Sequence, residues 1–132
     1  MSNHLAAPST ELLDFAGMFP RSVIDVHYYT LFDNKFSTFT VQQNIDYVRN
    51  TIANDLRTLS RRIGALTFVG EWVAEWKVSG ATKEDYQRFG NAQMDVYRQA
   101  TFGRAYWTYK NVNNHWSMEW MRKNGYISLT NA

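Results

Sequence analysis

The chain has 132 residues, which is long enough for one domain and too short for two. Hydrophobic residues make up 45% of it, close to the globular average, which argues against a disordered tail or a membrane protein. The net charge of +2, with no block of like charges, argues against a nucleic-acid-binding surface.

Composition narrows the chemistry further. The chain has no cysteine, which excludes disulfides and thiolate metal sites. The first twenty residues lack an apolar core flanked by basic residues, so no signal peptide is expected, and no apolar run reaches transmembrane length. The aromatic share of 16% is high, and aromatic side chains build both cores and the flat apolar platforms on which sugar rings sit.

Two elements are predicted before residue 30. A short helix starts near Ser9 or Thr10 and stops around Gly17. Residues 23–29 are then rich in β-branched and aromatic side chains and almost continuously apolar. Such a run is typical of a strand in a parallel sheet that is buried on both faces.

A long amphipathic helix is predicted next. Thr40 followed by Gln43 is a capping-box pattern, which favours a helix start, and Gly64 is a natural C-cap. Between them, apolar residues recur at steps of three and four, as on the buried face of a helix. They are Val41, Ile45, Val48, Ile52, Leu56 and Leu59.

The same order then repeats. The pattern predicts a strand at 65–72, a helix capped by Thr82, a third strand at 104–109, and a last short helix at 117–123 closed by Gly125. Strands that alternate with helices predict an α/β fold with parallel strands and right-handed crossovers. The composition is uniform and no linker is visible, so a single domain is expected. Three strands, however, make neither a closed barrel nor a full doubly wound sheet.

Residues able to do chemistry follow all three predicted strands. The first strand ends in His27-Tyr28-Tyr29, the second in Gly70-Glu71-Trp72, and the third in Trp107-Thr108-Tyr109-Lys110. In parallel βα folds, function collects at the C-terminal ends of the strands. Glu71 directly follows an apolar strand, where a carboxylate is costly unless a site needs it. A carboxylate, an imidazole, phenols and an indole at one rim form the composition of a sugar cleft.

Each of these residues also has a structural interpretation when it is taken alone. A Glu such as Glu71 at a strand end is more often solvated or ion-paired than catalytic. A lone His such as His27 is more often a satisfied structural imidazole. Trp107 and Tyr29 are also typical core side chains. Only the joint pattern favours a site.

Three motifs stand in order along the chain: Val23-Ile24-Asp25-Val26-His27-Tyr28-Tyr29, Phe68-Val69-Gly70-Glu71-Trp72 and Ala105-Tyr106-Trp107-Thr108-Tyr109-Lys110. In order and spacing they resemble strand-end motifs of glycoside hydrolase family 5. The likeness is greatest to its exo-β-1,3-glucanase (glucan 1,3-β-glucosidase) branch, in particular the plant members, and continues through Asn114-His115-Trp116-Ser117 and Asn124-Gly125-Tyr126. The resemblance implies a (β/α)8 TIM barrel whose strands six to eight carry these motifs. The whole chain would then be the C-terminal part of a catalytic domain.

The resemblance implies a role for each matching residue. Glu71 matches the catalytic nucleophile of the family. His27 and Tyr29 match a His-x-Tyr pair that hydrogen-bonds around the reacting sugar and the nucleophile. Trp107 matches the aromatic floor under the sugar next to the scissile bond. The implied substrate is a β-glucan or β-glucoside, with β-1,3 linkages favoured, and neither a metal ion nor a cofactor is expected.

Other positions match the family less completely. Asn111, Asn113 and Trp116 lie in a loop that is expected to face the cleft. Arg104 departs from the family, in which we expect an apolar aromatic residue. A cation at the start of the third strand is expected to disturb the packing around it.

The family's acid/base Glu lies in an Asn-Glu-Pro motif, which occurs nowhere in this chain. Glu75 and Glu84 are predicted in the loop and the helix start after the second strand, so neither is expected to replace it. Retaining hydrolysis uses two carboxyl groups about 5–5.5 Å apart. We therefore expect a fragment of a retaining glycosidase that is nearly inactive by itself.

Two other classes stay open. A non-catalytic carbohydrate-binding remnant would keep Tyr29, Trp107 and Trp116 as a sugar platform. An interaction fragment would pair its exposed strand edges with another chain or with a second copy. No nucleic-acid or membrane partner is expected, and full-length relatives are expected outside the cell or in the cell wall.

Overall fold

The computed structural model describes residues 12–61 and 65–129. Its three strands form one parallel sheet in the order β1-β2-β3, with β1 at Ser22–Tyr28, β2 at Ala65–Trp72 and β3 at Gly103–Arg104. Helical segments separate the strands along the chain, as the alternating pattern predicts, because parallel neighbours need a crossover between them. The chain is therefore α/β with a small parallel sheet, an arrangement compatible with a run of βα units.

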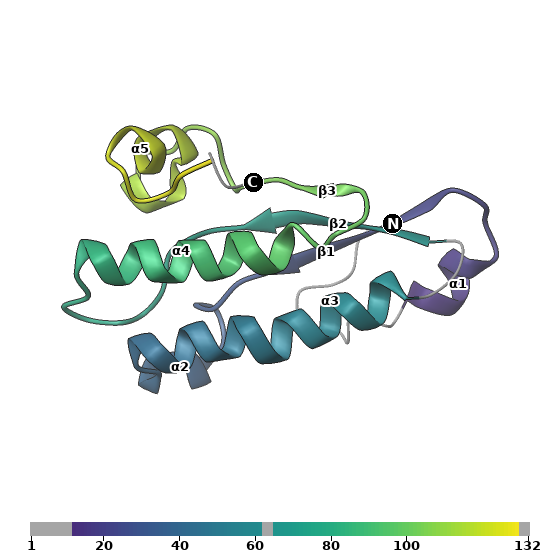
Figure 1. Cartoon of the computed structure of the whole chain (residues 1–132), viewed down its shortest axis with the longest axis horizontal. Coiled ribbons are helices and arrows are strands. Elements are labelled where there is room, and N and C mark those ends of the chain that lie inside the picture. The colour runs from purple at the N-terminus through teal and green to yellow at the C-terminus, as the bar shows by residue number, and fades with distance from the viewer. Residues whose placement is uncertain (1–11, 62–64, 130–132) are drawn as a thin grey trace.

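The helices run alongside the strands, and the segment from α2 to α3 packs beside α4 (Figure 1). Their bounds are α1 Leu13–Gly17, η2 Asn34–Thr38, α2 Val41–Asp46, η3 Tyr47–Ile52, α3 Ala53–Ser60, α4 Lys83–Tyr97, η4 Asn114–Trp116 and α5 Met118–Lys123. No helix within the described ranges is long and apolar enough to cross a membrane.

The predicted long helix is one continuous rod made of α2, η3 and α3 (Figure 1). Its middle section, η3, is π-helical, which the sequence pattern does not indicate. The apolar stripe faces the core, where Val41 is partly buried and the other members are at most 4% exposed. The predicted helix end at Gly64 and the predicted start of the first helix at Ser9 or Thr10 lie outside the described residues.

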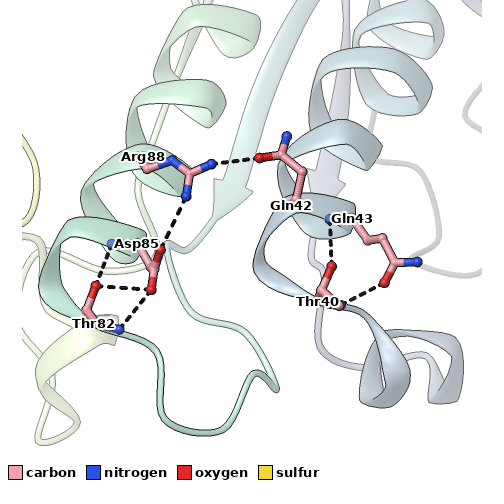
Figure 2. Close-up of polar contacts among 6 residues, drawn as sticks. All are labelled: Thr40, Gln42, Gln43, Thr82, Asp85 and Arg88. Carbon is pink, nitrogen blue, oxygen red and sulfur yellow. Dashed lines mark hydrogen bonds and ion pairs between the residues drawn. The ribbon is translucent and has the colours of Figure 1, made fainter.

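Both long helices begin at a capping box (Figure 2). Thr40 accepts a hydrogen bond from the Gln43 N–H at 3.2 Å, and the Gln43 side chain accepts one from the Thr40 N–H at 2.8 Å. Thr82 and Asp85 make the equivalent pair of bonds at the start of α4. The predicted caps are confirmed, and each box satisfies N–H groups that have no partner inside the helix.

Arg88 links the two helix starts (Figure 2). Its guanidinium lies 3.3 Å from the Asp85 carboxylate on its own helix, and it donates to the Gln42 side-chain oxygen on α2 at 2.6 Å. The N-terminal ends of α2 and α4 are therefore held next to each other by one side chain.

The sheet has one covered face and one open face. Val26 of β1 and its partner Val69 of β2 are at most 2% exposed and belong to the core shared with the helices. Side chains alternate along a strand, so neighbouring positions point to the other face. There Leu66 is 38% exposed, and Phe102, which is 59% exposed, lies against Phe68 with ring centroids 5.9 Å apart. An apolar patch is thus left on the open face.

The third strand is shorter than predicted. The sequence pattern predicts a strand at 104–109, whereas the regular ladder ends at Arg104. Beyond it, the N–H groups of Ala105 and Trp107 still donate to carbonyl groups of the β2 strand, each at 2.8 Å. The prediction was wrong about a regular ladder, because β2 itself is irregular opposite these residues, but the chain does continue along the edge of the sheet.

The capping box of α4 should contribute measurably to stability. Thr82→Ala removes the acceptor of the Asp85 N–H and should lower the free energy of unfolding by about 1 kcal/mol. Thr58→Ala is the matched control, because Thr58 lies on the exposed surface of α3 and alanine has the higher helix propensity. Urea unfolding followed by circular dichroism measures both variants. Equal losses would argue against the capping role.

The open face of the sheet should make the isolated chain self-associate. Sedimentation velocity should show a concentration-dependent shift, and Phe102→Ser should weaken it by about 1.5–3 kcal/mol, roughly tenfold or more in Kd, because the apolar ring is lost. Val112→Ser is the control, since Val112 is 96% exposed in a loop away from the ladder. A chain that stays monomeric at all concentrations would refute the prediction.

Candidate active site

The ends of β1 and β2 meet through an irregular step in the sheet. The two strands pair regularly as far as Val26 and Val69, and His27 then pairs with Glu71 rather than with Gly70. Gly70 is the extra residue of a β-bulge, a feature that re-aims side chains next to functional sites. As a result, Glu71 stands opposite His27 at the C-terminal end of the sheet.

A side chain at this bulge would displace Asp25 from its present position. A Cβ at position 70 would lie 2.0 Å from Oδ1 of Asp25, far inside contact distance. Asp25 reaches this point from β1, two residues before His27 and on the same face of the strand. The bare Cα of Gly70 therefore makes room for a carboxylate behind the imidazole.

Glu71 has two polar neighbours from the end of β1. The Tyr29 hydroxyl donates to Oε2 at 2.7 Å, and Nδ1 of His27 lies 3.6 Å from the same oxygen. The Glu71 side chain is 25% exposed, and among the described residues no hydrogen bond reaches Oε1. The described ranges hold no group of three or more His, Cys, Asp or Glu placed to bind a metal ion.

Asp25 belongs to this site, although the sequence pattern did not mark it as a site residue. Its Oδ2 lies 3.1 Å from Nε2 of His27, and its buried Oδ1 has no hydrogen-bond partner among the described residues. An ionised carboxylate only accepts, so Nε2 carries the hydrogen and Asp25 fixes the ring orientation. The available signal was an acidic residue inside the apolar run 23–29, two positions from His27.

Trp107 reaches the same end of the sheet from the third strand. Its N–H donates at 2.8 Å to the carbonyl of Trp72, the residue after Glu71. Its side chain is 47% exposed, so it is not a core residue. His27, Glu71 and Trp107 therefore lie at one end of a parallel sheet, as their positions at the ends of successive strands predict.

Three aromatic rings form a wall beside Glu71, which we call the aromatic wall: Tyr29, Phe32 and Trp116. The Tyr29 and Trp116 rings are stacked, with centroids 5.9 Å apart. Phe32 lies 4.9 Å from the Tyr29 ring and 6.3 Å from the Trp116 ring, and it is 61% exposed. The structure thus joins Trp116 to the site and adds Phe32, which sits in a polar loop and gave no signal in the sequence.

Asn111 and Asn113 lie in an exposed loop and have no hydrogen bond to the residues described above. Both are exposed, and the Asn111 side-chain oxygen accepts a hydrogen bond from the Asn113 N–H at 2.9 Å. Across residues 12–61 and 65–129, no hydrogen bond connects either amide side chain to Glu71, His27 or Tyr29. Asn111 therefore shapes the loop as an Asx turn, and substrate contact by these two residues stays a prediction.

Glu75 lies four residues after Glu71 but in a different environment. It accepts hydrogen bonds from the Tyr86 hydroxyl at 3.0 Å and from the Trp76 N–H at 2.9 Å, and Nδ1 of His115 lies at 3.0 Å. Burial raises the pKa of Glu75, but the bonds with His115 and Trp76 outweigh it, so the net pKa is lowered. A carboxyl group held ionised in this way is a poor proton donor.

Arg104 lies on the covered face of the sheet, since it pairs with Val69. Within the described part of the chain its side chain makes no hydrogen bond and no ion pair. It lines a cavity of about 300 Å³. That the cation disturbs the packing around it stays a prediction. The other lining residues are Trp72, Met94, Tyr106, Met118 and Leu129.

Comparison with known proteins gives information about the fold of the chain but not about its function. No family model and no curated protein matches the chain. The crystal structure of AoRut is similar, with a TM-score of 0.66 and 23% sequence identity. The match covers 96% of this chain and 36% of the AoRut chain, so the chain spans little more than a third of that protein's length. At this identity the likeness shows the fold alone.

The contact between Tyr29 and Glu71 should be visible in the titration of the phenol. Burial raises the pKa of Tyr29, and the hydrogen bond and the negative charge of Glu71 raise it further. Glu71→Gln should therefore lower the pKa of Tyr29, which ¹³C NMR of labelled tyrosine follows during an alkaline titration. Glu84→Gln is the control, because Glu84 is exposed on α4. An unchanged Tyr29 pKa in Glu71→Gln would show that the two side chains are not in contact.

Proposed function

We propose that the chain is the C-terminal portion of a (β/α)8 glycoside hydrolase of family 5, carrying strands six to eight and the nucleophile, Glu71. The observation that carries the proposal is the setting of Glu71 at the sheet rim, with the Tyr29 hydroxyl at 2.7 Å and the His27 ring at 3.6 Å. The nucleophile of a retaining glycosidase has to be ionised, fixed and open to the substrate. A hydrogen-bonded, quarter-exposed carboxylate meets these needs.

The contacts also suggest which oxygen attacks. Tyr29 and His27 both approach Oε2, which leaves Oε1 as the atom that forms the bond to the anomeric carbon. As that bond forms, the bond to the leaving oxygen breaks, and the leaving oxygen takes a proton from a general acid. Water then cleaves the glycosyl ester with retention of configuration. Asp25 serves this step indirectly, because it orients the His27 ring beside Oε2.

The aromatic side chains support a sugar as the substrate. Trp107 offers a half-exposed indole at the rim, and the aromatic wall stands on the side of Tyr29. Pyranose rings present apolar C–H faces that pack on such surfaces, while their hydroxyls need polar partners such as His27 and Glu71. The preference for β-glucans, and for β-1,3 linkages in particular, rests on the motif resemblance.

Residues 12–61 and 65–129 do not supply a proton donor opposite Glu71. Glu75 is engaged by His115, Tyr86 and Trp76, and Glu84 is exposed on α4. General acid catalysis contributes roughly 10²–10⁴-fold, so the chain alone should hydrolyse ordinary glucosides at background rates. A complete barrel with an Asn-Glu-Pro glutamate opposite Glu71 would be the active form.

A substrate that needs no general acid tests the nucleophile in this chain. The probe is a β-glucoside with dinitrophenolate as the leaving group and fluorine in place of the 2-hydroxyl, which forms a long-lived ester with the nucleophile. Mass spectrometry should find one fluoroglucosyl group on the peptide that contains Glu71. Glu84→Gln should label like the unmodified chain, and Glu71→Gln should not label. Labelling of another residue, or undiminished labelling of Glu71→Gln, would remove Glu71 from this role.

A second function, sugar binding without chemistry, is favoured by the aromatic wall and by the exposed indole of Trp107. It predicts that laminari-oligosaccharides bind the chain and that binding weakens in Trp107→Ala, while the fluoroglucoside leaves no covalent label. Calorimetric titration together with the labelling experiment separates the two functions.

A further inference from the structure

A second polar cluster lies among the segments that follow β2 and β3, and the chemistry proposed for Glu71 does not use it. Its centre is the hydrogen bond between Glu75 and Nδ1 of His115, at 3.0 Å, with side chains that are 26% and 20% exposed. Tyr86 of α4 donates to the same carboxylate at 3.0 Å, and its ring centroid lies 4.2 Å from that of His115. The cluster thus joins the loop after β2, the helix α4 and the loop after β3.

The backbone on either side of His115 is tied down by further bonds. The Tyr106 hydroxyl donates to the His115 carbonyl and accepts from the Ala74 N–H at 3.1 Å. The Thr108 N–H donates at 2.7 Å to the carbonyl of Trp116. Each of these bonds fixes the short segment η4, which ends with Trp116.

This placement connects the cluster to Glu71 through two aromatic rings. His115 is the residue before Trp116, and the Trp116 ring stacks on Tyr29, whose hydroxyl donates to Glu71. Glu75, in turn, is only four residues beyond Glu71 on the same segment. The contact between Glu75 and His115 therefore completes a ring of contacts, which runs from Glu71 through Tyr29 and Trp116 to His115 and back to Glu75.

We propose that Glu75 and His115 are a positioning pair, which holds Trp116 against Tyr29 and so keeps the Tyr29 hydroxyl on Glu71. The inference deepens the proposed function, because Tyr29 and Trp116 flank the candidate nucleophile. A hydrogen bond to an ionised carboxylate is stronger than a neutral one, which suits a contact that must fix a short irregular segment. Without Glu75, His115 and Tyr86 both lose an acceptor, and of the hydrogen bonds named above the segment η4 keeps only those to Tyr106 and Thr108.

A purely structural role makes a different prediction. A pair that only stabilised the packing of α4 on η4 would lower the unfolding midpoint, and the folded molecules would keep the Tyr29–Trp116 contact unchanged. The deciding measurement is therefore that contact in the folded chain, and not stability.

The experiment is NMR of the full chain, with nuclear Overhauser effects between the Tyr29 and Trp116 rings as the readout. Glu75→Ala should reduce their intensity severalfold, and Glu84→Ala, an exposed glutamate on α4, should leave it unchanged. His115→Asn should retain most of the contact, because its amide nitrogen can replace Nδ1 as the donor to Glu75. Full intensity in Glu75→Ala would overturn the proposal. If Glu75→Ala does not fold, Glu75→Gln decides in the same way, since it keeps the shape and removes the charge.

The readout is independent of any sugar, so it separates this inference from the proposed function. If the fluoroglucoside fails to label the chain but Glu75→Ala still releases Trp116, the positioning pair stands and the glycosidase proposal falls. If labelling succeeds, Glu75→Gln should slow it roughly ten- to hundredfold without abolishing it, because Glu71 remains but is less well placed. Labelling at the unmodified rate, with intact ring contacts, would contradict the positioning role.

Discussion

The close approach of Asp25 to Gly70 controls the geometry at the end of the sheet. The carboxylate occupies the space that a side chain at position 70 would fill, so Asp25 keeps this position only with glycine there. The bulge in turn moves the register by one residue and brings Glu71, instead of Gly70, opposite His27. Without it, the strict alternation of a strand would turn Glu71 toward the helices, where an ionised group would have no water and no partner.

Glu71 and Glu75 lie on one short segment, but their surroundings differ in the hydrogen bonds that they offer. Glu71 keeps one oxygen without a hydrogen bond and faces few partners. Glu75 has three donors within 3.0 Å and a lowered pKa. Because its folded-state pKa is lowered, its contacts stabilise the chain above the pKa of the unfolded state and are lost as the pH falls through the folded-state value. The first glutamate is thus left accessible, and the second is held by the residues around it.

Much of the fold follows from local patterns in the sequence. Apolar runs with β-branched residues marked β1 and β2 to within one residue, and the helix start at Thr40 carried its own capping signal. The third strand was overestimated, because apolar and aromatic residues at 104–109 look like a ladder, while pairing also depends on the partner strand. The bulge in that partner strand depends on tertiary contacts, and Gly70 is its only sign in the sequence.

The candidate site was predictable in part for the same reason. Residues at strand ends, such as His27 and Glu71, are brought together by topology alone, and topology could be read from the order of elements. Asp25 was missed because its role depends on a contact across strands, with Gly70. Phe32 was missed because a ring in a polar loop has no periodic pattern, so only the folded structure shows that it packs on Tyr29. The strand order and the residues at the strand ends can thus be predicted from local sequence patterns. The contacts of Asp25 and Phe32 cannot, because they join distant parts of the chain.

The π-helical section η3 also has a consequence for how the chain tolerates change. Each residue of an α-helix adds about 100° of rotation, so one extra residue would normally turn everything before it to a new side. A π-helical turn absorbs the extra residue by widening locally. Gln42 at one end of the rod can therefore stay against Arg88 while Leu56 and Leu59 at the other end stay in the core. The rod has two fixed ends and one adjustable turn, so its length in residues can vary by one without either end losing its neighbours.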